Sequence, residues 1–208
     1  MINKLTLFLF SIFFSTLSFS QEMSVKSPLK LNALFSDHMV LQQSTNVSFW
    51  GTCSPNETLS LTGSWGGKST MLVDATGDWK LDLETPEAGG PFTVEIETKF
   101  HKKSLIDIMI GEVWLASGQS NMEMPLRGWP PNDAIDNSKE EITKSGYPEI
   151  RMFTVERQLS LDPKVTFNGK WTVSTPETSG GFSASAYFFA RRLHKTLNVP
   201  IGIIHSSW

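Results

Sequence analysis

The chain has 208 residues, of which 39% are hydrophobic and 19% charged, a balance typical of globular proteins and not of disordered ones. Its formal net charge of −3, without a dense run of Lys and Arg, argues against nucleic acid as a main partner. The single cysteine, Cys53, excludes an intrachain disulfide framework and a cysteine-rich metal site.

Residues 1–20 have the composition of an export signal. Lys4 is their only charge, Leu5–Phe14 form an apolar run, and Ser18 and Ser20 are small residues spaced as a cleavage site requires. A membrane anchor is the alternative, but a membrane span needs about 20 mostly apolar residues, and Ser and Thr interrupt this run. We therefore expect a cleaved signal peptide, a secreted or periplasmic protein, and no stable membrane anchor.

Residues 21–109 predict an antiparallel β-sandwich domain. Apolar and polar residues alternate in short runs such as Trp79–Leu83 and Phe92–Ile96, the period of strands with one buried face. Gly, Pro, Asn and Asp between these runs predict turns, and seven or eight short strands at this spacing are typical of a sandwich. Trp50, Trp65 and Trp79 could form a sugar-binding platform here, although the alternation places Trp79 in the core.

The sequence pattern changes at residue 110, and residues 110–208 predict the beginning of an α/β domain. A strand, a helix and a strand with short links favour a right-handed parallel crossover. The expected elements are an apolar strand covered on both faces at Glu112–Ala116, a polar helix at Asp133–Lys144, a strand at Ile150–Val155, a helix at Ala184–Leu197 capped by Ser183, and a strand at Ile201–Ile204.

The last of these helices has an apolar stripe formed by Ala186, Phe189, Ala190, Leu193 and Leu197. Three strands make a thin parallel sheet, and the third lies next to the final residue. We therefore expect residues 110–208 to be the N-terminal part of a longer domain. A small complete α/β domain is the alternative.

The turn Ser117-Gly-Gln-Ser-Asn121 follows the first of these strands. The carboxyl edge of a parallel sheet is where α/β folds bind ligands. Gly118 permits a tight turn, and the backbone N–H of Ser120 can face the same space as its Oγ, so one residue could supply a nucleophile and an oxyanion donor. The G-x-S-x-G pattern is not met, because Met122 takes the last glycine's place. A Ser/Asn turn without catalytic role is the alternative.

Four stretches in the same order resemble one family. They are Leu34–Gln42, Gly111-Glu-Val-Trp-Leu-Ala-Ser-Gly-Gln-Ser-Asn-Met-Glu123, Phe182–Ala190 and Pro200-Ile-Gly-Ile-Ile-His-Ser-Ser-Trp208. Together they resemble the SASA-domain family, the sialate O-acetylesterases and related carbohydrate acetylesterases of the SGNH hydrolase type. The resemblance covers nearly the whole chain after residue 20. It implies a β-sandwich followed by an SGNH-hydrolase-like α/β domain with a parallel sheet.

The resemblance also implies serine esterase chemistry on an acetylated sugar or polysaccharide, such as sialic acid or a plant polysaccharide, without metal or organic cofactor. Ser120 would be the nucleophile, and Gly118, Gln119 and Asn121 would support the turn and its oxyanion hole. In family members, a Gly-Gly pair, a later side-chain amide donor and a still later Asp-x-x-His base follow the Ser-Ser-Trp stretch, which in this sequence is Ser206–Trp208. The resemblance therefore places these three groups after the last residue of the sequence. We therefore expect the chain alone to be a poor esterase.

Three further residues are candidates for a pocket wall: Trp129, His205 and Trp208. His205 ends a strand at the same edge as Ser120, so it could be a base or a hydrogen-bonded wall residue. Trp129 could stack on a sugar or belong to a rigid loop packed on the core. A different class of function also fits the residues, namely a non-catalytic carbohydrate-binding or interaction module with a vestigial esterase stub. The sequence does not indicate an oligomeric state.

Overall fold

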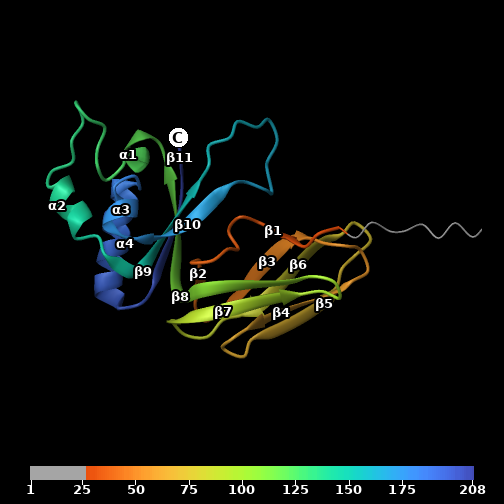
Figure 1. The fold of residues 1–208 in the computed structure, drawn as a ribbon. Helices are drawn as coiled ribbons and strands as arrows, with labels where there is room; N and C mark the ends of the chain where they lie inside the picture. Colours follow the sequence, from red (N-terminus) through yellow and green to blue (C-terminus); the bar gives the residue numbers. More distant parts are fainter. Residues whose placement is uncertain (1–26) are drawn as a thin grey trace, which may run out of the picture.

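The computed structural model describes residues 27–208 (Figure 1). The expected signal peptide, residues 1–20, lies outside the described residues. The helices formed by residues 27–208 do not include one with the length and hydropathy of a membrane-spanning segment.

Two sheets share one core in the first half of the chain. A three-stranded sheet has the order β1-β3-β6, and strands β7, β4 and β5 continue a second sheet from β8. Phe49 and Leu83 from the first sheet meet Leu59 and Ile96 from the second in a single apolar cluster. The strands are β1 Lys30–Leu31, β2 Val40–Gln42, β3 Asn46–Thr52, β4 Thr58–Gly63, β5 Lys68–Leu72, β6 Asp78–Glu84, β7 Gly89–Glu97 and β8 Lys102–Gly118.

Strand β8 belongs to both halves of the molecule. Its first part pairs antiparallel with β7, and its last part, from Glu112 to Gly118, pairs in parallel with β11. The second sheet is therefore mixed and extends from β5 to β10. The boundary that we expected between residues 109 and 110 falls inside this continuous 17-residue strand and not in a linker.

The second half of the chain places β11 between β8 and β9, parallel to both. The helices gather on one side of these strands (Figure 1), while Phe153 and Trp171 on the strands pack against the core of the first half. The elements are α1 Ser120–Glu123, α2 Ser138–Thr143, β9 Tyr147–Val155, β10 Gly169–Ser174, α3 Pro176–Ser179, α4 Ala184–Leu197 and β11 Ile201–Ser207.

Helix α4 has the bounds expected from its sequence. The Oγ atom of Ser183 accepts a hydrogen bond from the N–H of Ala186, and Asn198 ends the helix in the left-handed conformation. Its buried face differs from the expected stripe. Tyr187 is fully buried, whereas Phe189 and Leu197 are 42% and 49% exposed.

Two other expectations need correction, and one strand was not expected. The helix expected over Asp133–Lys144 is confined to α2, because Asn137 adopts a left-handed conformation just before it. Strand β10, which pairs antiparallel with β9, was not anticipated. The strand at Glu112–Ala116 is not covered on both faces among the described residues, since Trp114 is 44% and Leu115 68% exposed.

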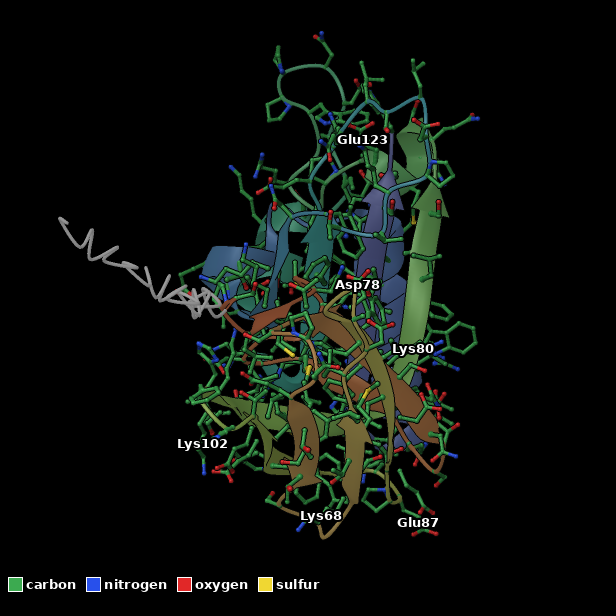
Figure 2. The ribbon with its side chains drawn as sticks, turned by 90° about the vertical axis from the view of Figure 1, so that its right-hand side faces the viewer. Lys68, Asp78, Lys80, Glu87, Lys102 and Glu123 are labelled. Carbon is green, nitrogen blue, oxygen red and sulfur yellow. The ribbon has the colours of Figure 1, made fainter. Side chains whose placement is uncertain are left out.

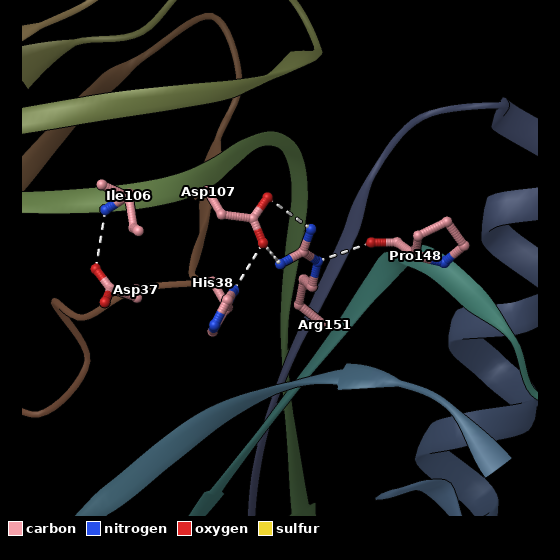
Figure 3. Close-up of polar contacts among 6 residues, drawn as sticks. All are labelled: Asp37, His38, Ile106, Asp107, Pro148 and Arg151. Carbon is pink, nitrogen blue, oxygen red and sulfur yellow. Dashed lines mark hydrogen bonds and ion pairs between the residues drawn. The ribbon is translucent and has the colours of Figure 1, made fainter. Parts of the chain in front are cut away.

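A bulge in β8 is tied to both halves through Asp107 (Figure 3). The backbone of Asp107 has a φ of 55°, and the register of β7 and β8 shifts beside it. The buried guanidinium of Arg151 on β9 donates two hydrogen bonds to the carboxylate, at 2.7 and 3.1 Å. His38, which precedes β2, lies 2.6 Å from the same carboxylate. Hydrogen bonds from Arg151, and secondarily from His38, lower the pKa of Asp107.

Candidate functional site

The turn that follows β8 presents Ser120 at the surface. Gly118 has a φ of 154°, which favours glycine, and Gln119 precedes the single turn of α1. The N–H groups of Met122 and Glu123 both donate to the carbonyl oxygen of Gln119 at 2.9 Å, which closes the turn.

Both reactive groups of Ser120 are free of partners within residues 27–208. Its side chain is exposed, and its Oγ atom makes no hydrogen bond to the described residues. Its N–H opens α1 and so has no acceptor within the helix. The turn therefore leaves a hydroxyl and a backbone donor of one residue available to a ligand.

The end of β11 lies beside this turn. Ser206 pairs with Ser117, and Ser207 with Gly118. The N–H of Trp208 then donates to the carbonyl oxygen of Gly118 at 3.1 Å. The side chain of Trp208 is 59% exposed, so an aromatic surface stands next to the turn that carries Ser120.

An open cleft of about 680 Å³ lies at this edge of the sheet, among the ends of β8, β9 and β11 and the loop from β9 to β10. Its walls combine apolar surface with hydroxyl and charged groups, as small-molecule sites commonly do. The residues that line it include Leu115, Ser117, Gly118, Glu156, Arg157, Lys164, Phe167, Ser206, Ser207 and Trp208. Ser120 is not among the lining residues and follows Gly118, which is one of them, by two positions.

His205 is a buried wall residue in this arrangement. It is 8% exposed, its Nε2 lies 2.6 Å from the Oγ of Ser207, and its ring meets the edge of Phe182. Its Nδ1 makes no hydrogen bond of normal geometry to the described residues, although the Met122 backbone lies close enough to favour protonation. The effect of burial is larger than that of the Met122 backbone, so the pKa of His205 is lowered. No hydrogen bond joins it to Ser120 within residues 27–208.

The other residues predicted for the site, Gln119, Asn121 and Trp129, differ in how close they lie to the cleft. Gln119 and Asn121 are exposed on either side of Ser120, where their side chains can reach a ligand. Trp129 is 40% exposed, but its backbone pairs with Asp133 in a separate loop, and it does not line the cleft. The structure therefore brings Trp208, and not Trp129, to the cleft.

The sugar platform considered for the first half does not form. Trp79 is 3% exposed, Trp65 donates its indole N–H to the carbonyl oxygen of Glu84 at 2.8 Å, and Trp50 packs its edge against Phe35. Among the described residues, the tryptophans with large exposed area are Trp114, Trp129 and Trp208, all in the second half.

An ion pair beside the turn escaped the sequence analysis. Glu123, at the end of α1, pairs with Arg157, which follows β9 and lines the cleft. Figure 2 shows Glu123 in the second half of the molecule, far from Lys68 and Lys102. Glu123 and Arg157 are distant in sequence, so their pairing could not be predicted. The sequence showed only that Glu123 ends the stretch Gly111–Glu123, which resembles the family. Elsewhere in residues 27–208, no group of three or more His, Cys, Asp or Glu side chains is placed to hold a metal ion.

Comparisons with known proteins point in one direction. The chain is 32% identical over 189 residues to human sialate O-acetylesterase, an alignment that covers 82% of this chain and 35% of that protein. The mouse sialate O-acetylesterase is 30% identical over 190 residues, which cover 83% of this chain and 34% of the relative. The chain thus spans about a third of the length of these curated relatives. No protein-family model matches it.

A solved structure gives the same result in three dimensions. A carbohydrate acetylesterase from Xanthomonas citri superposes with a TM-score of 0.81 at 34% identity, covering 87% of this chain and 40% of the other. At this identity the likeness extends to the sequence as well as to the fold.

Proposed function

The chain is a homologue of the sialate O-acetylesterases and of a bacterial carbohydrate acetylesterase, and we propose that it carries the nucleophile of an exported serine esterase acting on O-acetylated carbohydrates. The observation that carries this proposal is the position of Ser120. Its free hydroxyl and free N–H lie at the carboxyl edge of parallel strands, two residues after Gly118, which lines a cleft.

The proposed reaction passes through an acetyl-enzyme. The Oγ of Ser120 attacks the acetyl carbonyl, and the N–H of Ser120 donates to the oxyanion that develops. The bond between the acetyl carbon and the sugar oxygen then breaks, and the sugar leaves as an alcohol after taking up a proton. Water attacks the acetyl-serine, which releases acetate and restores the hydroxyl.

A general base must take the proton of Ser120 in the first step. We place this base outside residues 27–208, because His205 already contacts Ser207 and the other described histidines lie elsewhere. His38 contacts Asp107, and His194 contacts the carbonyl of Val199. The Asp-x-x-His of the resembling family fits this role. Without a base, a serine hydroxyl is a weak nucleophile.

The sugar would occupy the cleft beside Trp208. An exposed indole suits the C–H face of a sugar ring, and the hydroxyls of Ser206 and Ser207 can exchange hydrogen bonds with sugar hydroxyls. Turnover of O-acetylated sialic acid compared with that of an acetylated xylo-oligosaccharide would identify the sugar. Because residues 1–20 resemble an export signal, we further propose that the protein acts in the periplasm or outside the cell.

Substitution of Ser120 tests the proposal. In the full-length protein, Ser120→Ala should lower kcat for an acetylated carbohydrate by about 10³-fold or more, while substrate binding is kept. Ser104→Ala is the matched control, because Ser104 is also an exposed serine on β8 but does not line the cleft. Equal turnover by wild type and Ser120→Ala would overturn the proposal. Sugar binding without any turnover by wild type would support a binding module instead.

A further inference from the structure

The start of helix α4 holds the turn that carries Ser120. Three consecutive residues donate hydrogen bonds to carbonyl oxygens in and just after α1. The donors and acceptors are Ser183 Oγ to Met122 at 2.5 Å, Ala184 N–H to Met124 at 2.8 Å, and Ser185 Oγ to Asn121 at 3.1 Å.

Helix α1 depends on such external support. It has only four residues, none of them buried, and Gln119 provides no side-chain cap. A single helical turn is not stable by itself, because nucleation fixes several dihedral angles for one hydrogen bond. The conformation of residues 119–124 is therefore set by what α1 contacts.

Ser183 makes the most consequential of these contacts. Its side chain is 1% exposed, and its hydroxyl has two partners. It accepts the N–H of Ala186, which begins α4, and it donates to the carbonyl of Met122, two residues after Ser120. The hydroxyl of Ser183 thus caps the first turn of α4 and also holds α1 in its orientation.

We infer that Ser183 is a positioning residue for Ser120. Its bond to the Met122 carbonyl holds α1 so that the Oγ and N–H of Ser120 keep the orientation needed for attack on the acetyl group. This inference rests on the proposed function. Misplacement of a reacting group by about 1 Å can cost about 100-fold in rate, so a lost tether should reduce kcat far more than it changes KM.

Two substitutions separate the cap from the tether. Glycine at a helix N-cap costs only a few tenths of a kcal/mol, so Ser183→Gly preserves the start of α4 but removes the donor to Met122. Ser183→Thr keeps a hydroxyl. We expect Ser183→Gly to lower kcat of the full-length protein by about 10- to 100-fold with KM within about twofold, and Ser183→Thr to recover most of the loss.

Ser174 offers a matched control. It is also 1% exposed, and its Oγ donates to the backbone carbonyl of Ser145 at 2.8 Å, away from α1. Ser174→Ala removes a buried hydroxyl of the same kind, so it should lower Tm while leaving kcat near the wild-type value. The inference would be overturned if kcat fell no further in Ser183→Gly than in Ser174→Ala. It would also be overturned if Ser183→Thr recovered none of the lost kcat.

Hydrogen exchange provides a readout that does not depend on activity. We expect the amides of Glu123 and Met124, which close α1, to exchange at least about tenfold faster in Ser183→Gly and at the normal rate in Ser174→Ala. If Ser120→Ala keeps full activity, the proposed function fails, and exchange still reports whether Ser183 orders the turn. Unchanged exchange in Ser183→Gly contradicts the positioning role directly.

Discussion

The N–H of Trp208 donates a 3.1 Å hydrogen bond to the carbonyl oxygen of Gly118. This bond extends the parallel pairing of β11 and β8 by one residue beyond β11, so the exposed indole of Trp208 stands beside the turn that begins with Gly118. Trp208 and Gly118 both line the cleft, so we expect a sugar bound there to contact the indole.

Removal of the indole should weaken binding of the sugar more than it slows the chemistry. Aromatic packing contributes about 0.5–1.5 kcal/mol, so we expect Trp208→Ala to raise KM for an acetylated oligosaccharide by about 2- to 10-fold, with kcat changed by less than about twofold. Trp129→Ala is the control, because Trp129 is exposed but does not line the cleft. Steady-state kinetics in which Trp129→Ala shows the larger rise in KM would contradict this placement of the sugar.

The backbone at Gly118 should not tolerate a side chain. Its φ of 154° is rarely adopted by residues with a Cβ, and an added Cβ would lie 3.3 Å from the Cβ of Met122. Strain of this kind costs about 1–3 kcal/mol, so Gly118→Ala should lower both the free energy of unfolding and kcat. Gly146→Ala should change neither by much, because a Cβ there meets nothing within 4 Å. Urea denaturation gives the stabilities of both variants, and equal values would refute the argument.

The Asp107 carboxylate should stabilise the protein in a pH-dependent way. Asp107→Asn removes the charge that faces the buried guanidinium of Arg151, so it should lower the free energy of unfolding by about 2 kcal/mol near neutral pH. Hydrogen bonds from Arg151, then from His38, lower the pKa of Asp107 in the folded state. The stabilisation is therefore complete above the unfolded pKa of about 3.9 and is lost as the pH falls through the lower folded pKa.

Denaturation of wild type and Asp107→Asn at several pH values checks this sign. The difference in stability should be constant down to about pH 5 and shrink below about pH 4. Asp78→Asn is the control, because Asp78 is exposed on β6 and its substitution should leave stability nearly unchanged at every pH. A difference that grows on acidification would show that the carboxylate destabilises the fold.

His205 should behave as a wall residue and not as the base. Burial lowers its pKa, so the folded state favours the neutral ring. Because the folded state binds this proton less readily than the unfolded state does, the free energy of unfolding decreases as the pH falls from the unfolded pKa of about 6.5 through the lower folded pKa. His205→Asn should therefore reduce the loss of stability of the protein on acidification below about pH 6.5. It should also keep kcat within about tenfold of wild type, whereas removal of a catalytic base costs several orders of magnitude. A kcat as low as that of Ser120→Ala would assign His205 to the base.

Local signals in the sequence predicted some elements well. The bounds of α4 follow from Ser183 and Asn198, because capping depends on residues next to each other in the chain. The exposed turn at Ser120 follows in the same way from an apolar strand that runs into Gly118. In each case, the residues that determine the structure are neighbours in sequence.

Features that depend on distant residues were not predictable in this way. The face of α4 that is buried includes Tyr187 and excludes Phe189, because packing against β9 and β11 decides it, and not the helical period alone. The pairs of Glu123 with Arg157 and of Asp107 with Arg151 join residues more than 30 and 40 positions apart. Such pairs leave no periodic pattern in one sequence.

Covalent trapping of Ser120 would test the central claim most directly. The full-length protein would be treated with an organophosphonate that mimics the tetrahedral intermediate, and the modified peptide would be located by mass spectrometry. We predict a single adduct on Ser120, formed in proportion to the loss of esterase activity and absent from Ser120→Ala. Complete inactivation with the adduct on another residue, while Ser120 remains unmodified, would contradict the account.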